Sequence, residues 1–395
     1  MFDERVRVDA IRVRELRLPL SAPFRISTGA LTERRSWIVE LESAGIVGYG
    51  ESAPNDEPFY CEETLGTVHT LLEELFLPRL RGRTFESIDA FDAELRRGVR
   101  GNAFARVGLE NAYWDLCCRR AGVALVDAIA ARLRALGLPA QHCEPRASIE
   151  SGVAVGIPED EKPSTLGRTI EEHLAHGYHR VKIKIRPGWD VEACRVARSA
   201  VGEGFALWTD ANASFELERD LDALRAMDAF GLLFHEQPLD HRDLVDHARL
   251  GREIRTPICL DESLTCERAG RAALELGAAK IWNIKVQRVG GLCEATRIYR
   301  LAVEGGARLW GGTMPESGIG AQPIIALAAF PAFVFAADVE PSSRWYRPGH
   351  DPIELTLARD GTIAVPRTAG VAASLDRERY ARYTRPVLGG GTADH

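Results

Sequence analysis

Three acidic residues each follow a short apolar run of the sequence at nearly equal intervals. Asp210, Glu236 and Asp261 stand 26 and 25 residues apart, and each comes after a stretch typical of a buried strand. Carboxylates brought together from successive strands supply the oxygen ligands of a hard divalent cation, and Mg²⁺ suits one oxygen from each residue. Taken singly, Asp210 or Asp261 would fit the cap of a following helix better. The three in register favour a metal site for Mg²⁺, with Mn²⁺ as an alternative ion.

Three lysines lie in or just after strand-like runs, where a buried strand would not normally carry charge. In the run 181–185, Lys182 and Lys184 share one face because side chains alternate along a strand. We expect both ammonium groups inside a barrel, where their repulsion should lower the pKa of at least one. The alternative is an exposed edge strand with a lysine face. Lys285 follows the run 280–284, and it is either a catalytic group nearly opposite Lys184 or a counter-ion for one of the acids.

Other residues near these positions are weaker candidates for substrate contacts. Asn212 and Glu262 closely follow two of the acids, and Glu316 lies beyond the seventh apolar run. A supporting or capping role fits these three as well as a ligand role. Gly312 belongs to one of two glycine pairs that either cradle an anion or form tight turns. His235 directly precedes a predicted metal ligand, so alternation points its side chain away from the site.

From residue 146 to 345, short apolar runs alternate with helical stretches, which is the pattern of repeated βα units. The runs lie at 147–155, 181–185, 206–209, 232–234, 257–260, 280–284, 307–310 and 333–336. Eight such units predict an α/β protein with a (β/α)8-type modified TIM barrel rather than an open sheet. Barrel enzymes carry their catalytic groups at the carboxyl ends of the strands, and the acids and Lys285 occupy these ends.

The flanking segments predict an α+β capping domain. Residues 1–145 contain strand-like runs at 8–18 and 37–48, and then helical patterns near 63–77, 85–97 and 103–121. Residues 346–395 should return to the cap, with a hairpin of 353–357 and 362–365 around Asp360-Gly361, a favoured hairpin turn. We expect the glycine-rich end of the chain to be disordered.

Composition narrows the classes of function. The 395 residues carry a net charge of −7, which disfavours nucleic-acid binding because phosphate contacts need an excess of Lys and Arg. The charged amino terminus lacks the apolar core of a signal peptide, and the most apolar stretch, 323–337, is too short to span a bilayer. The eight cysteines include no Cys-x-x-Cys pair. We therefore expect a cytoplasmic protein with reduced thiols and no nucleic-acid or membrane partner. A homo-oligomer is a further expectation.

Five motifs in order carry a family resemblance that covers nearly the whole chain. They are Lys182-Ile183-Lys184, Asp210-Ala211-Asn212, Glu236-Gln237-Pro238, Asp261-Glu262-Ser263 and the segment 285–291. Together they resemble the enolase superfamily, in its muconate-lactonizing subgroup. Within that subgroup, residues 185–190 and 316–320 look most like o-succinylbenzoate synthases and their N-succinylamino acid racemase relatives, and residues 342–346 are similar to the same branch.

The resemblance implies a reaction and a role for each candidate. The reaction is removal of a proton α to the carboxylate of a small substrate through an enediolate, followed by dehydration in a synthase or by racemisation; a dipeptide epimerase or cycloisomerase is a further alternative. Lys184 and Lys285 would face opposite sides of the substrate. The resemblance also implies that Asp210, Glu236 and Asp261 bind Mg²⁺, and that Lys182 lowers the pKa of Lys184. Substrate or electrostatic contacts are implied for Asn212, Glu262, Gly312, Glu316 and Ser317.

A lid and a choice of substrate complete the interpretation. We expect Phe24 and Tyr60, in loops rich in small, polar and aromatic groups, to cover the barrel mouth. Ala154 stands where relatives often have Ser, and the segment 338–340 loosely resembles the paired acids of dipeptide epimerases, so the substrate stays open. A barrel-shaped binding protein without catalysis would keep the acids but could lack Lys285. The presence of two lysines favours an enzyme.

Overall fold

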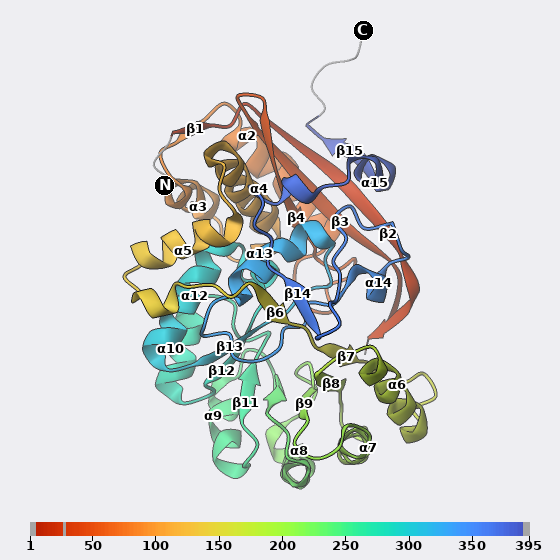
Figure 1. Ribbon diagram of the computed structural model, residues 1–395. Helices are drawn as coiled ribbons and strands as arrows, with labels where there is room; N and C mark the ends of the chain where they lie inside the picture. Colours follow the sequence, from red (N-terminus) through yellow and green to blue (C-terminus); the bar gives the residue numbers. More distant parts are fainter. Residues whose placement is uncertain (1–4, 27–28, 390–395) are drawn as a thin grey trace.

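The chain forms a cap, made of an antiparallel sheet with helices, above a βα barrel (Figure 1). The structure is a computed structural model that describes residues 5–26 and 29–389, and for residues 23–26 and 29–31 it describes the backbone alone. The glycine-rich end that was expected to be disordered lies, apart from Gly389, outside the described residues. Both ends of the described chain lie at the cap, on opposite sides of it in Figure 1.

Four antiparallel strands form the sheet of the cap, in the order β15-β2-β3-β4. They are β2 (Ala10–Ile26), β3 (Gly29–Ser43), β4 (Ile46–Ser52) and β15 (Thr384–Leu388). Because β15 pairs with β2 across almost the full length of the sequence, the carboxyl-terminal segment completes the cap, as expected for residues 346–395. Figure 1 shows α15 (Arg377–Tyr383) lying beside this sheet.

Helices pack on the inner side of the cap sheet. They are α1 (Leu65–Leu71), which continues through a π-helical turn Leu72–Phe76 into α2 (Leu77–Leu80), then α3 (Ile88–Arg96), α4 (Ala103–Ala121) and α5 (Leu125–Ala135). A small pair, β1 (Val6–Arg7) with β5 (Thr84–Phe85), closes the edge of the cap. Helix α4 touches β4 so closely that a Cβ on Gly48 or Gly50 would lie 2.2 or 2.1 Å from its backbone carbonyls. Glycine is therefore required at both positions.

Seven parallel strands form most of the barrel, in sequential order. They are β7 (Val153–Val155), β8 (Arg180–Lys184), β9 (Ala206–Asp210), β10 (His235–Glu236), β11 (Ile258–Leu260), β12 (Ile281–Ile284) and β13 (Arg308–Gly311). The eighth predicted run forms bridges rather than a strand: Phe333 pairs with Leu309 on one side, and Ala337 pairs with Ser151 on the other. These bridges close the ring that the repeated units predicted.

The barrel helices follow the strands in turn. They are α6 (Pro163–Ala175), α7 (Val191–Val201), α8 (Leu217–Met227), α9 (Leu244–Glu253), α10 (Glu267–Leu276), α11 (Val286–Val289), α12 (Leu292–Gly305), α13 (Gly318–Ala328) and α14 (Ser342–Trp345). Three-residue 3-10 turns lie at Ala140–His142, Asp228–Phe230 and Ala372–Ser374. A separate aromatic cluster of Trp208, Phe234 and Trp310 fills the barrel interior together with Cys259 and Ile281. Packed side chains therefore close the barrel interior below the site.

Buried carboxylates fasten the cap to the barrel. Glu110 of α4 accepts hydrogen bonds from the backbone N–H groups of Leu292 and Cys293, at 2.8 and 2.7 Å, at the start of α12. Glu51 of β4 accepts one from Ser317 Oγ at 2.5 Å. Because carboxylates at helix starts satisfy unpaired N–H groups, these contacts fix the cap over the barrel mouth.

Three local predictions need correction. The run 37–48 is not one strand but the end of β3, a turn at Ala44-Gly45 and the start of β4. Residues 353–357 form no strand, so the expected hairpin does not exist. Instead β14 (Thr362–Ala364) pairs with β6 (Ser148–Glu150), although the predicted tight turn before it is present. The helix expected from residue 85 begins at Ile88, because Ser87 accepts the cap hydrogen bond from Ala90 N.

Candidate active site

The three predicted metal ligands stand side by side at the carboxyl ends of adjacent strands. Glu236 on β10 pairs in register with Asp210 on β9, and Asp261 directly follows β11. All three side chains are buried, with at most 1% of each residue exposed. Burial raises the pKa of Glu236 well above its usual range, and the neighbouring charges of Asp210 and Asp261 add to this effect. Such a concentration of buried negative charge requires cations close by.

Lys182 lies at the centre of the site and not on an exposed edge. Strand β8 runs between β7 and β9, which excludes the edge-strand alternative. Lys182 Nζ lies 2.5 Å from Asp338 Oδ2 and 3.2 Å from both Asp210 Oδ2 and Glu236 Oε2. Burial alone would lower the pKa of Lys182, but these carboxylates raise it well above the usual value. At this lysine the effect is therefore opposite to the predicted fall.

Lys184 shares the inner face of β8 with Lys182 and lies closer to solvent. Its Nζ donates hydrogen bonds to Asp210 Oδ2 and to Asn212 Oδ1, both at 2.6 Å. Asn212 Nδ2 in turn donates to Glu262 Oε1 at 2.9 Å. Burial raises the pKa of Glu262 to about 7, with Asp261 and Asp210 contributing. Asn212 and Glu262 thus form a hydrogen-bonded chain that begins at Lys184.

Lys285 directly follows β12, four staves from β8, and therefore on the opposite side of an eight-stave ring. Its Nζ donates to Asp261 Oδ2 at 2.8 Å and lies 5.0 Å from the centre of the Tyr60 ring. Arg288, one turn further along, pairs with the other oxygen of the same aspartate. Burial would lower the pKa of Lys285, but Asp261 and Tyr60 raise it above the usual value.

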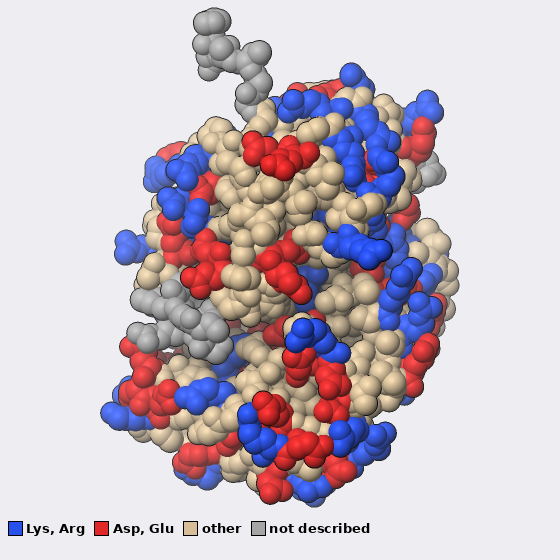
Figure 2. Space-filling model, turned by 180° about the vertical axis from the view of Figure 1, so that it is seen from behind, with Lys and Arg blue, Asp and Glu red and all other residues tan. Residues whose placement is uncertain are grey.

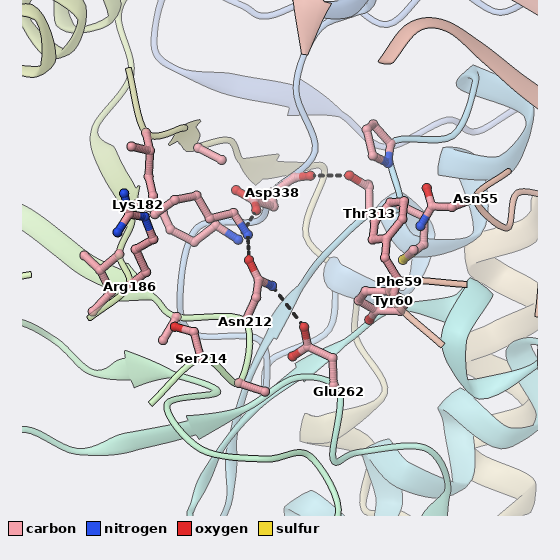
Figure 3. Close-up of a pocket in the computed structure, with 18 of the residues that line it drawn as sticks. Asn55, Phe59, Tyr60, Lys182, Arg186, Asn212, Ser214, Glu262, Thr313 and Asp338 are labelled. Carbon is pink, nitrogen blue, oxygen red and sulfur yellow. Dashed lines mark hydrogen bonds and ion pairs between the residues drawn. The ribbon is translucent and has the colours of Figure 1, made fainter. Parts of the chain in front are cut away.

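Lys184 and Lys285 line one cavity of about 540 Å³ at the mouth of the barrel. Figure 3 shows Asn212 and Asp338 near its middle, Arg186 on one side, and Asn55, Phe59 and Tyr60 on the other. The last three come from the cap, so the cap supplies one wall of the cavity. Tyr60 therefore lies where the predicted lid should lie. The side chain of Phe24, the other predicted lid residue, is outside the described residues.

Two further candidates, Ser317 and Glu316, lie away from the cavity lining. Ser317 starts α13 and binds Glu51 of the cap. Glu316 is buried and accepts a hydrogen bond from Met314 N at 2.5 Å. Its carboxylate thus shapes the loop that lines the cavity, and the cavity lining does not include it. In this structure Glu316 holds this loop and Ser317 holds the cap, and the substrate contacts predicted for both stay predictions.

Gly312 makes room for the side chain of Asn283, which is not among the predicted site residues. A Cβ on Gly312 would lie 2.4 Å from the side-chain oxygen of Asn283. Asn283 Nδ2 donates to Glu236 Oε1 at 3.0 Å and so orients this buried carboxylate. The signal was available in the sequence: Asn283 is the polar residue of the otherwise apolar run Ile281-Trp282-Asn283-Ile284. Gly312 itself is not part of the lining.

The donor set of the three acids fits a divalent cation. Their oxygens are hard ligands, and Oε2 of Glu236 is buried without a hydrogen-bond partner, with only the ion pair to Lys182 nearby. No three acidic, His or Cys side chains of the described residues are already arranged as a ligand cluster. Asp210 and Asp261 each pair with a lysine instead. The three carboxylates are thus suitable ligands for a divalent cation, and in this structure ion pairs with lysines hold them in place.

Comparison with protein families decides the wider identity. Residues 165–379 match the family model described as "Enolase C-terminal domain-like", and residues 8–130 match "Mandelate racemase / muconate lactonizing enzyme, N-terminal domain". The chain belongs to the enolase superfamily. The resemblance found in the sequence is therefore confirmed, and so is the fold of barrel and cap.

Individual relatives in this superfamily are similar over almost their whole length. An N-succinylamino acid racemase of Thermus thermophilus is 39% identical, over 94% of this chain and 95% of its own. An o-succinylbenzoate synthase of Geobacillus kaustophilus is 37% identical, over 96% of each chain. The relatives are lyases and isomerases, and this chain is an enzyme of the same superfamily.

Solved structures agree with this placement. A member of the enolase superfamily from Enterococcus faecalis has a TM-score of 0.86 at 31% identity, covering 97% of this chain and 99% of that one. Muconate lactonizing enzyme from Pseudomonas fluorescens has a TM-score of 0.84 at 23% identity, covering 96% and 100%, and shows the shared fold.

Within the described part of this chain, no helix is long and apolar enough to cross a membrane. Figure 2 shows acidic and basic side chains interspersed over one face of the molecule.

Proposed function

We propose that this enzyme is an o-succinylbenzoate synthase, which removes a proton α to a carboxylate and then eliminates water. One observation carries the proposal: Lys184 and Lys285 reach the same cavity from staves on opposite sides of the barrel. A proton α to a carboxylate is very weakly acidic, so its removal needs a positioned base on one side and positive charge around the developing dianion. The similarity to synthases at 36–37% identity supports this choice of substrate.

Mg²⁺, or Mn²⁺ in its place, would be held by Asp210, Glu236 and Asp261. When bound, it supplies positive charge that stabilises the doubly negative enediolate derived from the substrate. The burial of the three carboxylates and the unbonded oxygen of Glu236 support this assignment.

The remaining chemistry belongs to the lysines and to the residues that hold them. Lys184, in its neutral form, takes the α-proton at Nζ, and Asn212 keeps this nitrogen pointed into the cavity. Lys285 stays cationic on the opposite side and stabilises the enediolate electrostatically. The C–O bond to the β-hydroxyl then breaks as the enediolate electrons form the new double bond. The proton on Lys184 leaves with the hydroxide as water. The cap wall at Tyr60 excludes solvent during these steps.

N-succinylamino acid racemisation is a second candidate, favoured by the 39% identical relative. In that reaction Lys184 would remove the α-proton from one face, and Lys285 would return a proton to the other face. The approach of both lysines to one cavity from opposite sides of the barrel supports this exchange. A substrate with no leaving group on the β-carbon would be racemised, because elimination has no bond to break.

An assay of the purified Mg²⁺ enzyme distinguishes the two candidates. The β-hydroxy precursor of o-succinylbenzoate should be dehydrated, which absorbance follows, and a panel of N-succinyl amino acids should be tested for racemisation by polarimetry. Dipeptides serve as the negative panel. Turnover of dipeptides alone would overturn the proposal. We also propose a cytoplasmic location, which is supported by the absence of disulfides among the cysteines of the described residues. Homo-oligomerisation stays a prediction that light scattering can check.

A further inference from the structure

The inner face of β8 carries a row of three cations that continues beyond the strand. Lys182, Lys184 and Arg186 are two residues apart, and the alternating aliphatic residues 181, 183 and 185 are buried behind them. The exposed fraction of the cationic side chains rises along the row, from 4% at Lys182 through 25% at Lys184 to 40% at Arg186. The row therefore leads from the barrel interior to the rim of the cavity.

The three cations differ in what holds them. The two lysines are paired with buried acids, whereas Arg186 Nη2 pairs with Glu161 Oε2 at 2.7 Å on the rim, where the glutamate is 55% exposed. Its Nη1 donates to Pro187 O at 3.2 Å. An exposed ion pair of this kind contributes little to stability. Arg186 is thus the cation of the row that a ligand can take most easily from its present partner.

The backbone holds Arg186 in place but strains its partner. Arg186 and Trp189 exchange two backbone hydrogen bonds, of 3.1 and 2.8 Å, across a tight turn whose Gly188 has a φ of 83°. The buried Trp189 anchors this turn. Glu161 has a φ of 47°, in the left-handed region that a residue with a side chain adopts only at a cost. The backbone of Arg186 is therefore fixed by this turn, whereas the backbone of its partner Glu161 adopts a costly conformation.

We propose that Arg186 binds the second carboxylate of a dicarboxylate substrate, in the place that Glu161 Oε2 now occupies. The inference rests on the proposed function, whose substrates carry one carboxylate at the reacting carbon and another at the end of a four-carbon acyl arm. A strand rises about 3.3 Å per residue, so Arg186 starts about 7 Å beyond Lys184 along the row. The planar guanidinium suits a carboxylate because it can donate two parallel hydrogen bonds. Arg186 is then a specificity-determining residue for the distal acid.

A matched pair of ligands tests this role. One is an N-succinyl amino acid, and the other is its succinamoyl analogue, in which a neutral amide of the same size replaces the distal carboxylate. Arg186→Met should lower kcat/KM for the diacid about tenfold, mostly through a higher KM, because a charge-assisted hydrogen bond is lost. The value for the amide should change less than about twofold. Glu161→Gln should lower KM for the diacid, since an internal competitor is removed.

A surface arginine outside the cavity provides the control. Arg195 on α7 forms an exposed ion pair with Glu192 at 2.6 Å, and Arg195→Met should leave both ligands unaffected. Arg186→Lys should recover part of the lost discrimination. An equal loss for diacid and amide in Arg186→Met, or no loss for either, would overturn the inference.

The same proteins separate this inference from the proposed function. If the wild-type Mg²⁺ enzyme turns over neither N-succinyl amino acids nor the synthase substrate, the proposed function fails. Calorimetric binding of the two ligands to the wild type and to Arg186→Met then decides the inference by itself. A preference for the diacid that disappears in the variant supports it, and equal affinities refute it.

Discussion

Replacing Asp338 by Asn should destabilise the protein by about 3 kcal/mol, at the lower end of the range for breaking a buried ion pair. Asp338 lies 2.5 Å from Lys182 Nζ and 2.8 Å from Arg180 Nη1, whose side chains are only 4% and 1% exposed. The substitution leaves both cations buried with one negative charge fewer. The loss stays at the lower end because each cation keeps other partners: Arg180 donates to the carbonyls of Val153 and Ala337, and Lys182 keeps two carboxylates at 3.2 Å.

Urea unfolding of the metal-free protein, followed by tryptophan fluorescence in the presence of a chelator, measures this effect. Asp160→Asn is the matched control, because Asp160 and Lys162 form an exposed ion pair at 3.7 Å whose loss should cost less than about 1 kcal/mol. The reasoning is refuted if Asp338→Asn costs no more than the control, since that would mean that Lys182 and Arg180 do not need this carboxylate.

Three further predictions concern the site and a histidine outside it. Glu236→Gln should weaken Mg²⁺ binding and lower turnover by orders of magnitude while the circular dichroism spectrum stays native; full activity after exhaustive chelation would contradict the metal assignment. Lys184→Arg should abolish exchange of the substrate α-proton in deuterated water, because guanidinium does not deprotonate, whereas Lys285→Arg should retain a trace of dehydration but lose racemisation. Burial lowers the pKa of His173 to about 4, with Arg344 contributing, against about 6.5 in the unfolded chain. The stability that this neutral imidazole provides should be present above pH 6.5 and lost as the pH falls through 4; a His173 NMR titration midpoint near 6.5 would show that burial does not hold the neutral form.

The sequence predicts the parts of this fold that follow from local periodicity. Helix α4 begins and ends where its apolar spacing indicates, because Gly122 takes the left-handed conformation that terminates a helix. The staves of the barrel lie close to the predicted runs, since parallel strands buried on both faces are apolar throughout. Regular spacing then places acids and lysines at the carboxyl ends, and the structure brings Asp210, Glu236 and Asp261 to adjacent strand ends as predicted.

What the sequence does not reveal is which distant group each side chain meets. The strand Thr362–Ala364 follows a good hairpin turn, yet its partner is β6, more than two hundred residues earlier in the chain. Ser317 is itself a predicted site residue, but its hydroxyl binds a carboxylate that arrives from the cap. Turn chemistry and strand alternation are local properties, whereas these pairings depend on how the cap docks on the barrel. Asn283 is conspicuous as the polar residue of its apolar run, but its partner Glu236 becomes visible only across strands.

The nearly equal similarity to a racemase and to synthases has a chemical explanation in this site. Identities of 39% and 37% over almost the whole chain do not separate the two activities. In the proposed mechanism, both reactions begin with the same α-proton transfer to Lys184, and they differ only afterwards, in whether a β-hydroxyl leaves or Lys285 returns a proton. A barrel that keeps both lysines is equipped for either outcome. Under this mechanism the substrate that is admitted selects the reaction. We therefore propose that selection falls to residues at the rim, such as Arg186 and the cap wall at Tyr60, rather than to the two lysines.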